Sequence, residues 1–212
     1  FIVTSFEEHT EETFFQDVKK LKQSHNLTYD LKTNNYSISK YYSISHHREI
    51  EKLSERESID KFHSELKRSI DYRLRSDVTV GSCLSGGLDS STVASIASSR
   101  YMKESSNKKF TAIHAKSTEK DSDESYYASK VSEISNLDLI IVKPSIEDFK
   151  SHIDEVAYTQ EEPFGGPSIF MQYFVMKKAK EIGCTVMLDG QGGDEILLGY
   201  EKYYPSAYLN IF

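Results

Sequence analysis

Short apolar runs alternate with longer amphipathic runs over most of the chain. The apolar runs cover residues 78–84, 110–115, 138–143 and 185–189, and each has the length of a buried strand. The amphipathic runs, in which apolar residues recur at steps of three and four, predict helices over residues 90–101, 123–135, 146–158 and 168–182. Strands that alternate with helices favour right-handed crossover connections. We therefore predict an α/β fold with an open parallel sheet and helices on both faces.

A further amphipathic helix is predicted before the first of these strands. Its apolar positions recur at the same helical steps: Ile59, Phe62, Leu66, Ile70 and Leu74. Two later helices have recognisable ends. Ser145 lies three residues before Asp148, as in a capping box, and Gly183 follows the last apolar turn of the helix over 168–182.

The N-terminal part of the chain has a different composition. Residues 1–45 are rich in aromatic side chains, Asn, Thr and Ser, and Tyr36, Ile38 and Tyr41 show the partial alternation that is typical of strands. We predict that residues 1–45 end one β-rich domain, that residues 46–57 are a linker, and that residues 58–212 form the α/β domain.

Charge and composition exclude several classes of protein. The chain has 212 residues and a formal net charge of −7, which does not suit a nucleic-acid partner. We see no signal peptide and no apolar run long enough to cross a membrane. The two cysteines, Cys83 and Cys184, lie in apolar strand contexts and are expected to be buried thiols rather than a disulfide. We therefore expect a cytoplasmic protein that binds neither nucleic acid nor membrane.

The first candidate site is the glycine-rich segment that joins the strand over 78–84 to the next helix. A glycine pair after a strand can be a plain turn. Here, however, hydroxyl and carboxylate groups surround the glycines, and successive backbone N–H groups before a helix form an anion-binding nest. The residues of this predicted nest are Ser85, Gly86, Gly87, Asp89, Ser90 and Ser91. No lysine follows, as it would in a P-loop, so the pattern favours the pyrophosphate of ATP with Asp89 as a ligand of Mg²⁺.

The second candidate site follows the strand over 185–189. It reads Asp-Gly-Gln-Gly-Gly-Asp-Glu over residues 189–195 and combines three glycines with three carboxylates. Glycine-rich acidic segments also occur as plain turns. At the carboxyl end of a parallel strand, however, Asp194 and Glu195 could face the first loop and complete a site for Mg²⁺ and pyrophosphate.

These two segments carry a family resemblance. The first resembles the SGGxDS loop of the N-type ATP pyrophosphatases, which have an adenine nucleotide α-hydrolase-like fold. Together, SGGLDSS over 85–91 and DGQGGDEILLGY over 189–200 resemble the synthetase domain of the glutamine-hydrolysing asparagine synthetases. Residues 161–168 resemble the acidic, proline-containing stretch of the same domain, and residues 1–45 resemble the end of its glutaminase domain. The resemblance runs from about residue 55 to the C-terminus.

The resemblance implies a mechanism and a set of site residues. A substrate carboxylate, that of aspartate in the family, attacks the α-phosphorus of ATP and releases pyrophosphate, and ammonia from glutamine then converts the adenylate into an amide and AMP. By this resemblance Asp194, Glu195 and Gln191 are catalytic, and Asp89 and Asp194 bind Mg²⁺. The residues implied to bind ATP are Cys83, Leu84, Ser85, Gly86, Gly87, Asp89, Ser90, Ser91, Ala112, Ile113, Asp189 and Gly190.

Two positions leave alternatives open. Asparagine synthetases usually carry glutamate where this chain has Gln191, and a neutral amide cannot act as a base. The chain could therefore belong to a relative that forms an amide or lactam on another acid, or to a nucleotide-binding domain that no longer catalyses. The pair Asp123-Glu124 either begins a helix with an acidic turn or contributes to the site.

The first residue is Phe1 rather than Met, and we expect the chain to be a piece of a longer protein. The family's glutaminase nucleophile is an N-terminal cysteine, and its catalytic lysine lies further along than Phe212. We therefore expect these residues alone to show partial activity or none, and to work with a glutaminase domain of the same parent chain. The oligomeric state stays open, with a homodimer as one alternative.

Overall fold

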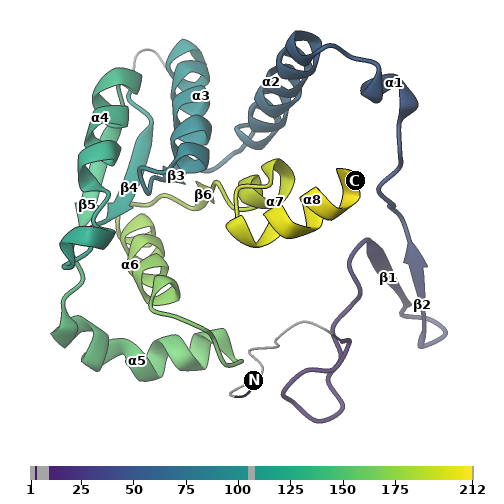
Figure 1. Cartoon of the computed structure of the whole chain (residues 1–212). Helices are drawn as coiled ribbons and strands as arrows, with labels where there is room; N and C mark the ends of the chain where they lie inside the picture. The colour runs from purple at the N-terminus through teal and green to yellow at the C-terminus, as the bar shows by residue number, and fades with distance from the viewer. Residues whose placement is uncertain (1–2, 4–9, 105–107, 212) are drawn as a thin grey trace. The chain divides into compact units, whose positions relative to one another are not determined.

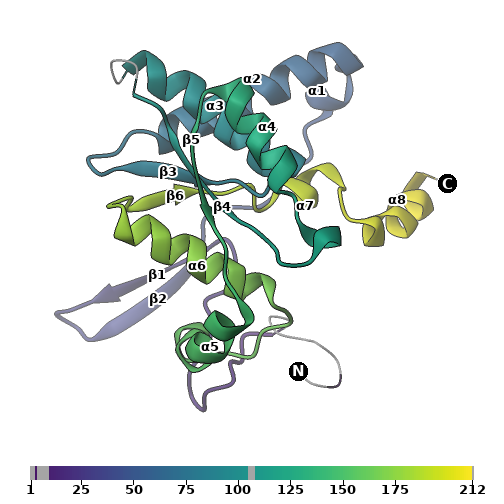
Figure 2. The ribbon, with the colours of Figure 1, turned by 90° about the vertical axis from the view of Figure 1, so that its left-hand side faces the viewer.

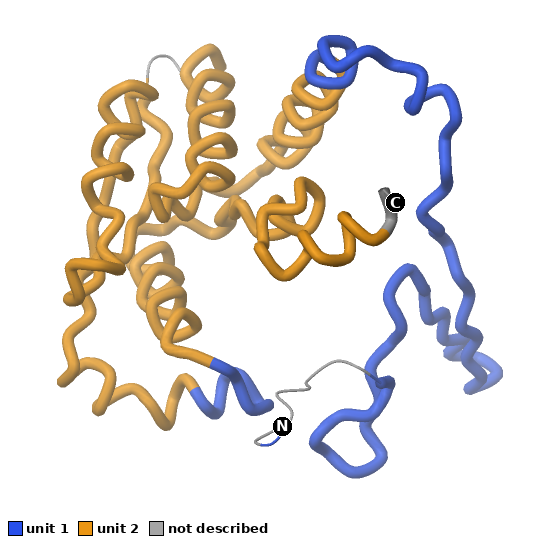
Figure 3. Tube along the Cα trace, viewed as in Figure 1, with its two compact units in different colours: residues 1–60, 157–165 blue, residues 61–156, 166–212 orange. Residues whose placement is uncertain are grey.

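The computed structural model of the chain describes residue 3 and residues 10–104 and 108–211. It contains two compact units (Figure 3). The first unit comprises residues 1–60 and 157–165, and the second comprises residues 61–156 and 166–212.

The second unit is built on a parallel sheet of four strands in the order β5-β4-β3-β6 (Figure 1). The strands are β3 (Val80–Cys83), β4 (Thr111–Ala115), β5 (Asp138–Val142) and β6 (Val186–Leu188). In the register of the sheet, Ser82 pairs with Ala112 on one side and with Leu188 on the other. This sheet confirms the predicted parallel α/β fold, and each predicted strand is present with slightly shorter bounds.

Helices cover both faces of the sheet. Figure 2 shows α3 and α4 on one face and α6 on the opposite face. The helices are α1 (Arg48–Glu51), α2 (Glu55–Arg73), α3 (Leu88–Glu104), α4 (Ser125–Ser135), α5 (Ile146–Gln160), α6 (Ser168–Glu181), α7 (Gly193–Leu197) and α8 (Tyr204–Ile211), with 3₁₀ turns η1 (Lys120–Ser122) and η2 (Glu201–Tyr203). Within the described residues, no helix is both long enough and apolar enough to cross a lipid bilayer.

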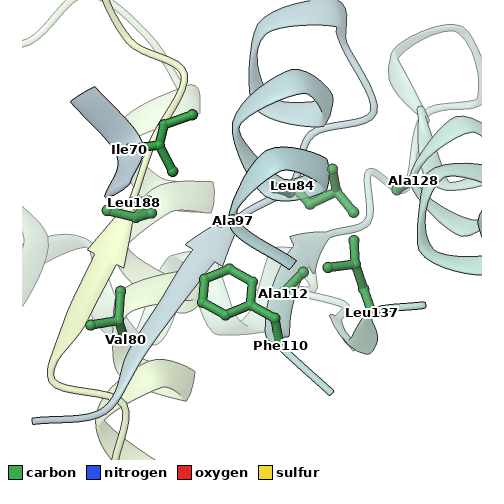
Figure 4. Packing of buried hydrophobic residues seen from close by; sticks show 10 residues of the cluster. Ile70, Val80, Leu84, Ala97, Phe110, Ala112, Ala128, Leu137 and Leu188 are labelled. Atoms are coloured by element: carbon green, nitrogen blue, oxygen red, sulfur yellow. The ribbon is translucent and has the colours of Figure 1, made fainter. Parts of the chain in front are cut away.

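The core of this unit has one cluster on each face of the sheet, because successive side chains of a strand point to opposite faces. Ala112 of β4 belongs to the first cluster and its neighbour Ile113 to the second. The first cluster contains Phe110, Leu84 and Ala97, and Phe110 is fully buried (Figure 4). Burial of a side chain the size of Phe110 stabilises the fold by about 1.5–3 kcal/mol.

The predicted helix ends agree with the local geometry. The backbone N–H of Ser145 donates to the Asp148 carboxylate at 2.8 Å, and the Asp148 N–H donates to the Ser145 hydroxyl at 3.1 Å, which completes the capping box before α5. Gly183 follows α6 with φ +74°, a backbone conformation that side chains disfavour. The helix predicted to begin at residue 123 begins two residues later, at Ser125, with Glu124 as its N-cap. The Asp123 carboxylate accepts the Ser125 N–H at 3.1 Å and so forms a turn just before the helix.

The first unit contains an antiparallel hairpin of β1 (His25–Asp30) and β2 (Asn35–Lys40), with His25 opposite Lys40. Within the same unit the Lys20 ammonium forms an ion pair with the Glu162 carboxylate at 2.8 Å. The hairpin exposes about half of each of the apolar side chains Leu27 and Ile38. Two-stranded hairpins are at best marginally stable on their own. The half-exposed apolar side chains are therefore typical of strands that belong to a larger sheet.

We expect Gly81→Ala to destabilise the second unit. A Cβ on Gly81 would lie 2.7 Å from the Cys184 Sγ and 3.1 Å from the Thr111 carbonyl oxygen, so β3 and β4 would have to separate. The free energy of unfolding of the full-length protein in urea should fall by about 1–3 kcal/mol.

Gly166→Ala is the matched control, because no atom lies within 4 Å of the Cβ it would add. Its effect on the free energy of unfolding should stay within about 0.5 kcal/mol. Equal effects of the two substitutions would contradict the steric account.

Candidate functional site

The order of the strands places the site. The chain passes from β3 to β4 and β5 and then returns to β6 on the other side of β3, so the direction of winding reverses between β3 and β6. Ligands of open parallel sheets bind at such a reversal, beyond the carboxyl ends of the strands. A pocket of about 820 Å³ lies there and is lined by the loops that follow both strands. Its volume is in the range of small-molecule sites, roughly 300–1,000 Å³.

Most of the predicted site residues line this pocket. They are Cys83, Leu84, Ser85, Gly87, Asp89, Ser90, Ile113, Asp189, Gly190, Gln191, Asp194 and Glu195. The other three, Gly86, Ser91 and Ala112, lie outside its lining. The side chain of Ala112 is buried in the first core cluster, and Gly86, with φ +101°, turns its backbone toward α4.

The loop over 85–90 is closed by its own hydroxyl groups. The Ser90 Oγ accepts the Ser85 N–H at 3.1 Å and lies 2.8 Å from the Ser85 Oγ, which in turn accepts the Gly87 N–H at 3.1 Å. The Ser91 hydroxyl is buried and has no hydrogen-bond partner within the described residues. The loop therefore has a defined shape without a ligand, with Ser85 and Ser90 facing the pocket.

Two glycines bring the loop after β6 against the start of α3. A Cβ on Gly190 would lie 2.7 Å from the Ser90 backbone nitrogen, and a Cβ on Gly193 would overlap the Asp89 carboxylate. At Gly190 the two nearest atoms belong to the backbone, so only a residue without a side chain fits. At Gly193 a side chain would force the Asp89 carboxylate to move. The glycines of the second loop thus allow the two predicted sites to meet.

The second loop then folds back on itself. Gly192 has φ +91° before α7, and the Gly199 N–H donates to the Asp194 carbonyl oxygen at 2.9 Å. A Cβ on Gly199 would overlap the Asp194 carboxylate. The negative charge of Glu195, with lesser contributions from burial and from Asp194, raises the pKa of Tyr200. The mouth of the pocket is therefore electrostatically negative.

Acidic side chains dominate the described lining of the pocket. It includes Asp89, Glu124, Asp189, Asp194 and Glu195, and it includes neither lysine nor arginine. A polyphosphate entering this pocket must therefore bring a cation with it.

The described residues of the pocket fit a Mg²⁺ ion that is bound partly by substrate phosphates, and they do not form a metal site made only of protein ligands. No group of three or more His, Cys, Asp and Glu side chains stands ready for a metal anywhere in the described part of the chain. Asp89 and Asp194 nevertheless line the same pocket with carboxylate oxygens. Mg²⁺ is usually held by one or two carboxylates together with substrate phosphates, and this donor set fits that pattern.

Cys83 lines the pocket, and its surroundings favour the protonated thiol. Burial, then the charge of Asp189 and a hydrogen bond to it, raises the pKa of Cys83 to about 12. Cys184 is also free and buried, and burial raises its pKa too. Neither cysteine has the lowered pKa of a catalytic thiol.

Several parts of the lining were not predicted from the sequence, among them one face of α6 and one residue of β4. One face of α6 contributes Ser168, Met171, Gln172 and Val175, at the helical steps of three and four. The periodicity was visible in the sequence, but it does not say which face meets the sheet and which meets the pocket. The residue of β4 is His114, whose only signal was a histidine in an apolar strand.

His114 is 3% exposed and lies at the centre of a chain of polar contacts. Its Nδ1 lies 2.8 Å from the Leu84 carbonyl oxygen and its Nε2 lies 3.0 Å from the Ser125 Oγ. The Ser125 hydroxyl also donates to Asp123, whose second oxygen lies 3.1 Å from the Lys116 ammonium. The Ser125 hydrogen bond, helped by Lys116, lowers the pKa of Asp123 to about 2. Asp123 therefore serves the start of α4, whereas its neighbour Glu124 lines the pocket.

Comparison with known proteins identifies matches over the same region. A family model described as asparagine synthase matches residues 61–211. Asparagine synthetase (glutamine-hydrolyzing) 1 of Bacillus subtilis is 32% identical over 68% of this chain, and asparagine synthetase (glutamine-hydrolyzing) 2 of the same organism is 30% identical over 91% of it. The amidase chyE of Penicillium rubens is 26% identical over 71% of the chain. These matches cover 22%, 26% and 24% of the three relatives, so the chain spans about a quarter of their length.

Solved structures also match the chain, at lower sequence identity. The U34-tRNA thiolase NcsA of Methanococcus maripaludis has a TM-score of 0.48 and 21% identity, and the match covers 70% of this chain and 51% of that one. An NH3-dependent NAD synthetase of Campylobacter jejuni has a TM-score of 0.44 and 21% identity, with 66% and 60% covered.

We expect the Cys83 thiol to react slowly with iodoacetamide in the folded full-length protein. The thiolate is the reactive form, and a pKa of about 12 leaves little of it at pH 8. The alkylation rate, followed by peptide mass spectrometry, should keep rising with pH beyond 9, whereas a free cysteine levels off near its pKa of about 8.5.

Asp189→Asn should raise the rate at pH 8, because it removes a negative charge that disfavours the thiolate. The urea-unfolded protein serves as the control and should react like free cysteine. A plateau below pH 9 in the folded protein would contradict the assigned surroundings of Cys83.

Proposed function

The chain belongs to the asparagine synthase family, and from this membership we propose that it carries the ATP-binding part of a ligase that converts a carboxylic acid into an amide. The observation that carries the proposal is the contact between the two loops at the reversal of the sheet, where Gly193 lies against the Asp89 carboxylate. This contact joins a hydroxyl-rich nest and an acidic loop in one pocket.

In this proposal the loop after β3 binds the phosphates of ATP. Ser85 and Ser90 would donate from their hydroxyl groups, and the N-terminal end of α3 would add its positive dipole. Backbone groups of Cys83, Leu84 and Ile113 would frame the adenine and ribose, for which their place in the pocket lining is the support. Gly86, Ser91 and Ala112 would act through the shape of the loop and of β4 rather than by touching the nucleotide.

Asp89 and Asp194 would hold Mg²⁺ in the proposed site. The ion would supply positive charge to the departing pyrophosphate. The excess of carboxylates over cationic side chains in the lining supports this assignment, because ATP alone would be repelled. Asp189 and Gly190 would hold the second loop in place, because the Asp189 carboxylate accepts the Gln191 N–H and Gly190 lies against the Ser90 backbone.

We further propose aspartate as the acid and glutamine-derived ammonia as the nitrogen donor. The carboxylate of aspartate would attack the α-phosphorus, pyrophosphate would leave, and ammonia would displace AMP from the acyl carbon. Glu195 and Gln191 would face the aspartate and the ammonia. Support comes from the names of the Bacillus subtilis relatives.

A second candidate is a ligase of the same chemistry with another acid. The neutral side chain at Gln191 and the similarity to a Penicillium rubens amidase favour it. A nucleotide-binding domain without catalysis is the third alternative, and the intact acidic residues Asp89, Asp194 and Glu195 speak against it.

We propose that residues 1–45 end a glutaminase domain of the same parent chain, that residues 46–57 link the domains, and that residues 58–212 belong to the ATP-binding domain. The half-exposed apolar side chains of the β1-β2 hairpin support this, because further strands would cover them. The two free cysteines are in keeping with the reducing cytoplasm, where we place the protein.

The full-length protein should bind ATP only in the presence of Mg²⁺. Asp89→Asn and Asp194→Asn should each weaken the binding of Mg-ATP at least about tenfold in isothermal titration calorimetry, because each removes an anionic ligand of the ion. Asp138→Asn, on an exposed position of β5, should leave the affinity unchanged. Equal affinity for ATP in magnesium and in EDTA would exclude the assigned roles of Asp89 and Asp194.

Gln191→Glu should change amide formation more than nucleotide binding. With aspartate and ammonia supplied, the rate of AMP and pyrophosphate release by the full-length protein should change about tenfold or more, while the affinity for Mg-ATP stays within about threefold. The new carboxylate would change the charge of the part of the site that is proposed to face aspartate and ammonia. A parallel change in rate and affinity would count against this placement of Gln191.

A further inference from the structure

The proposed function leaves one buried polar side chain of the pocket wall without a role. We propose that His114 is a positioning residue that fixes the phosphate-binding loop by holding the Leu84 carbonyl group. This inference rests on the proposed function, because it assigns His114 to the same nucleotide site.

The first reason is the place of Leu84, which directly precedes the loop. Its backbone N–H donates to the Ile113 carbonyl oxygen at 2.9 Å, so it is still aligned with β4 although β3 ends at Cys83. Its side chain is 1% exposed. Its carbonyl oxygen needs a donor, because a buried acceptor without one destabilises the fold. The imidazole Nδ1 supplies this donor at 2.8 Å.

The second reason is the fixed orientation of the ring. A carbonyl oxygen only accepts hydrogen bonds, so the Nδ1 of His114 carries hydrogen. The opposite nitrogen, Nε2, lies 3.0 Å from the Ser125 Oγ. Because Ser125 donates its one hydrogen to Asp123, its oxygen can only accept from Nε2. Ser125 is in turn fixed by Asp123, and Asp123 by Lys116. One end of the imidazole therefore contacts Leu84 and the other contacts the first residue of α4, so a turn of the ring would break both contacts.

The third reason is a second contact between the loop and the same helix. A Cβ on Gly86 would lie 2.8 Å from the Glu124 carbonyl oxygen and 3.0 Å from the Ala128 backbone nitrogen, so Gly86 rests directly on the first turn of α4. Leu84 is held to that turn through His114. Ser85 lies between these two supports in the sequence, and its N–H and hydroxyl groups contact the Ser90 Oγ within the loop.

Two substitutions separate the two ends of the ring. An asparagine amide nitrogen sits one bond from Cγ, as Nδ1 does, so His114→Asn keeps a donor for Leu84 and loses the contact with Ser125. A glutamine amide nitrogen reaches the place of Nε2, so His114→Gln keeps the contact with Ser125 and loses the donor for Leu84. His152→Asn is the control, because His152 packs between Tyr173 and Phe174 and does not line the pocket.

The experiment measures hydrogen exchange of the Ser85, Gly86 and Gly87 amides, the affinity for Mg-ATP and the melting temperature, all in the full-length protein. We expect His114→Gln to speed amide exchange in the loop and weaken Mg-ATP binding, each about tenfold, as loss of one buried hydrogen bond predicts. His114→Asn should stay within about threefold of the unsubstituted protein in both. The melting temperatures of the two variants should be similar. His152→Asn should change neither loop exchange nor affinity.

Equal exchange in the Asn and Gln variants would overturn the positioning role, whatever their melting temperatures. Failure of the unsubstituted protein to bind Mg-ATP would overturn the proposed function, and the exchange rates would still decide the role of His114. Nitrogen-15 NMR of the ring adds an independent check. A signal from hydrogen-bonded Nδ1–H supports the contact with Leu84, and a ring that carries hydrogen only on Nε2 excludes it.

Discussion

The close approach of two backbone segments, the loop after β6 and the start of α3, is the contact on which the pocket depends. Strand order alone brings the two loops to the same edge of the sheet. They can touch only because Gly190 and Gly193 leave room for the Ser90 backbone and the Asp89 carboxylate. The order of the strands brings the two loops to one edge of the sheet, and these glycines let the loops come close enough to contact the same ligand.

The charge of the pocket follows from the same contact. Joining the loops gathers carboxylates around a small volume, while the lysines and arginines of the described chain lie outside the lining. The anionic pocket of a chain with net charge −7 then selects for ligands that bring cations. Burial beside Asp189 keeps the Cys83 thiol neutral. These features support the proposed role of the pocket, in which it orients a metal-bound polyphosphate and does not attack a substrate with a side chain.

The sequence was sufficient to predict the four strands of the parallel sheet and the helices α2 to α6, because each of these has its own local pattern. The short helices α1, α7 and α8 were not predicted. Hydrophobic runs, the Ser145 capping box and Gly183 agree with the structure. The glycine-rich motifs also predicted which two loops form the pocket. What could not be predicted depends on contacts between distant residues. The Gly86 backbone turns toward α4 rather than into the pocket, and His114 joins β3 to α4 through its ring. Periodicity does not contain such information.

Each of the two carboxylates assigned to the metal faces a glycine. Asp89 abuts Gly193, and Asp194 abuts Gly199, with no room for a methyl group in either pair. A side chain at Gly193 or Gly199 would therefore push the facing carboxylate into another rotamer. The two glycines thus determine where the acids stand, although they contribute no ligand atom of their own.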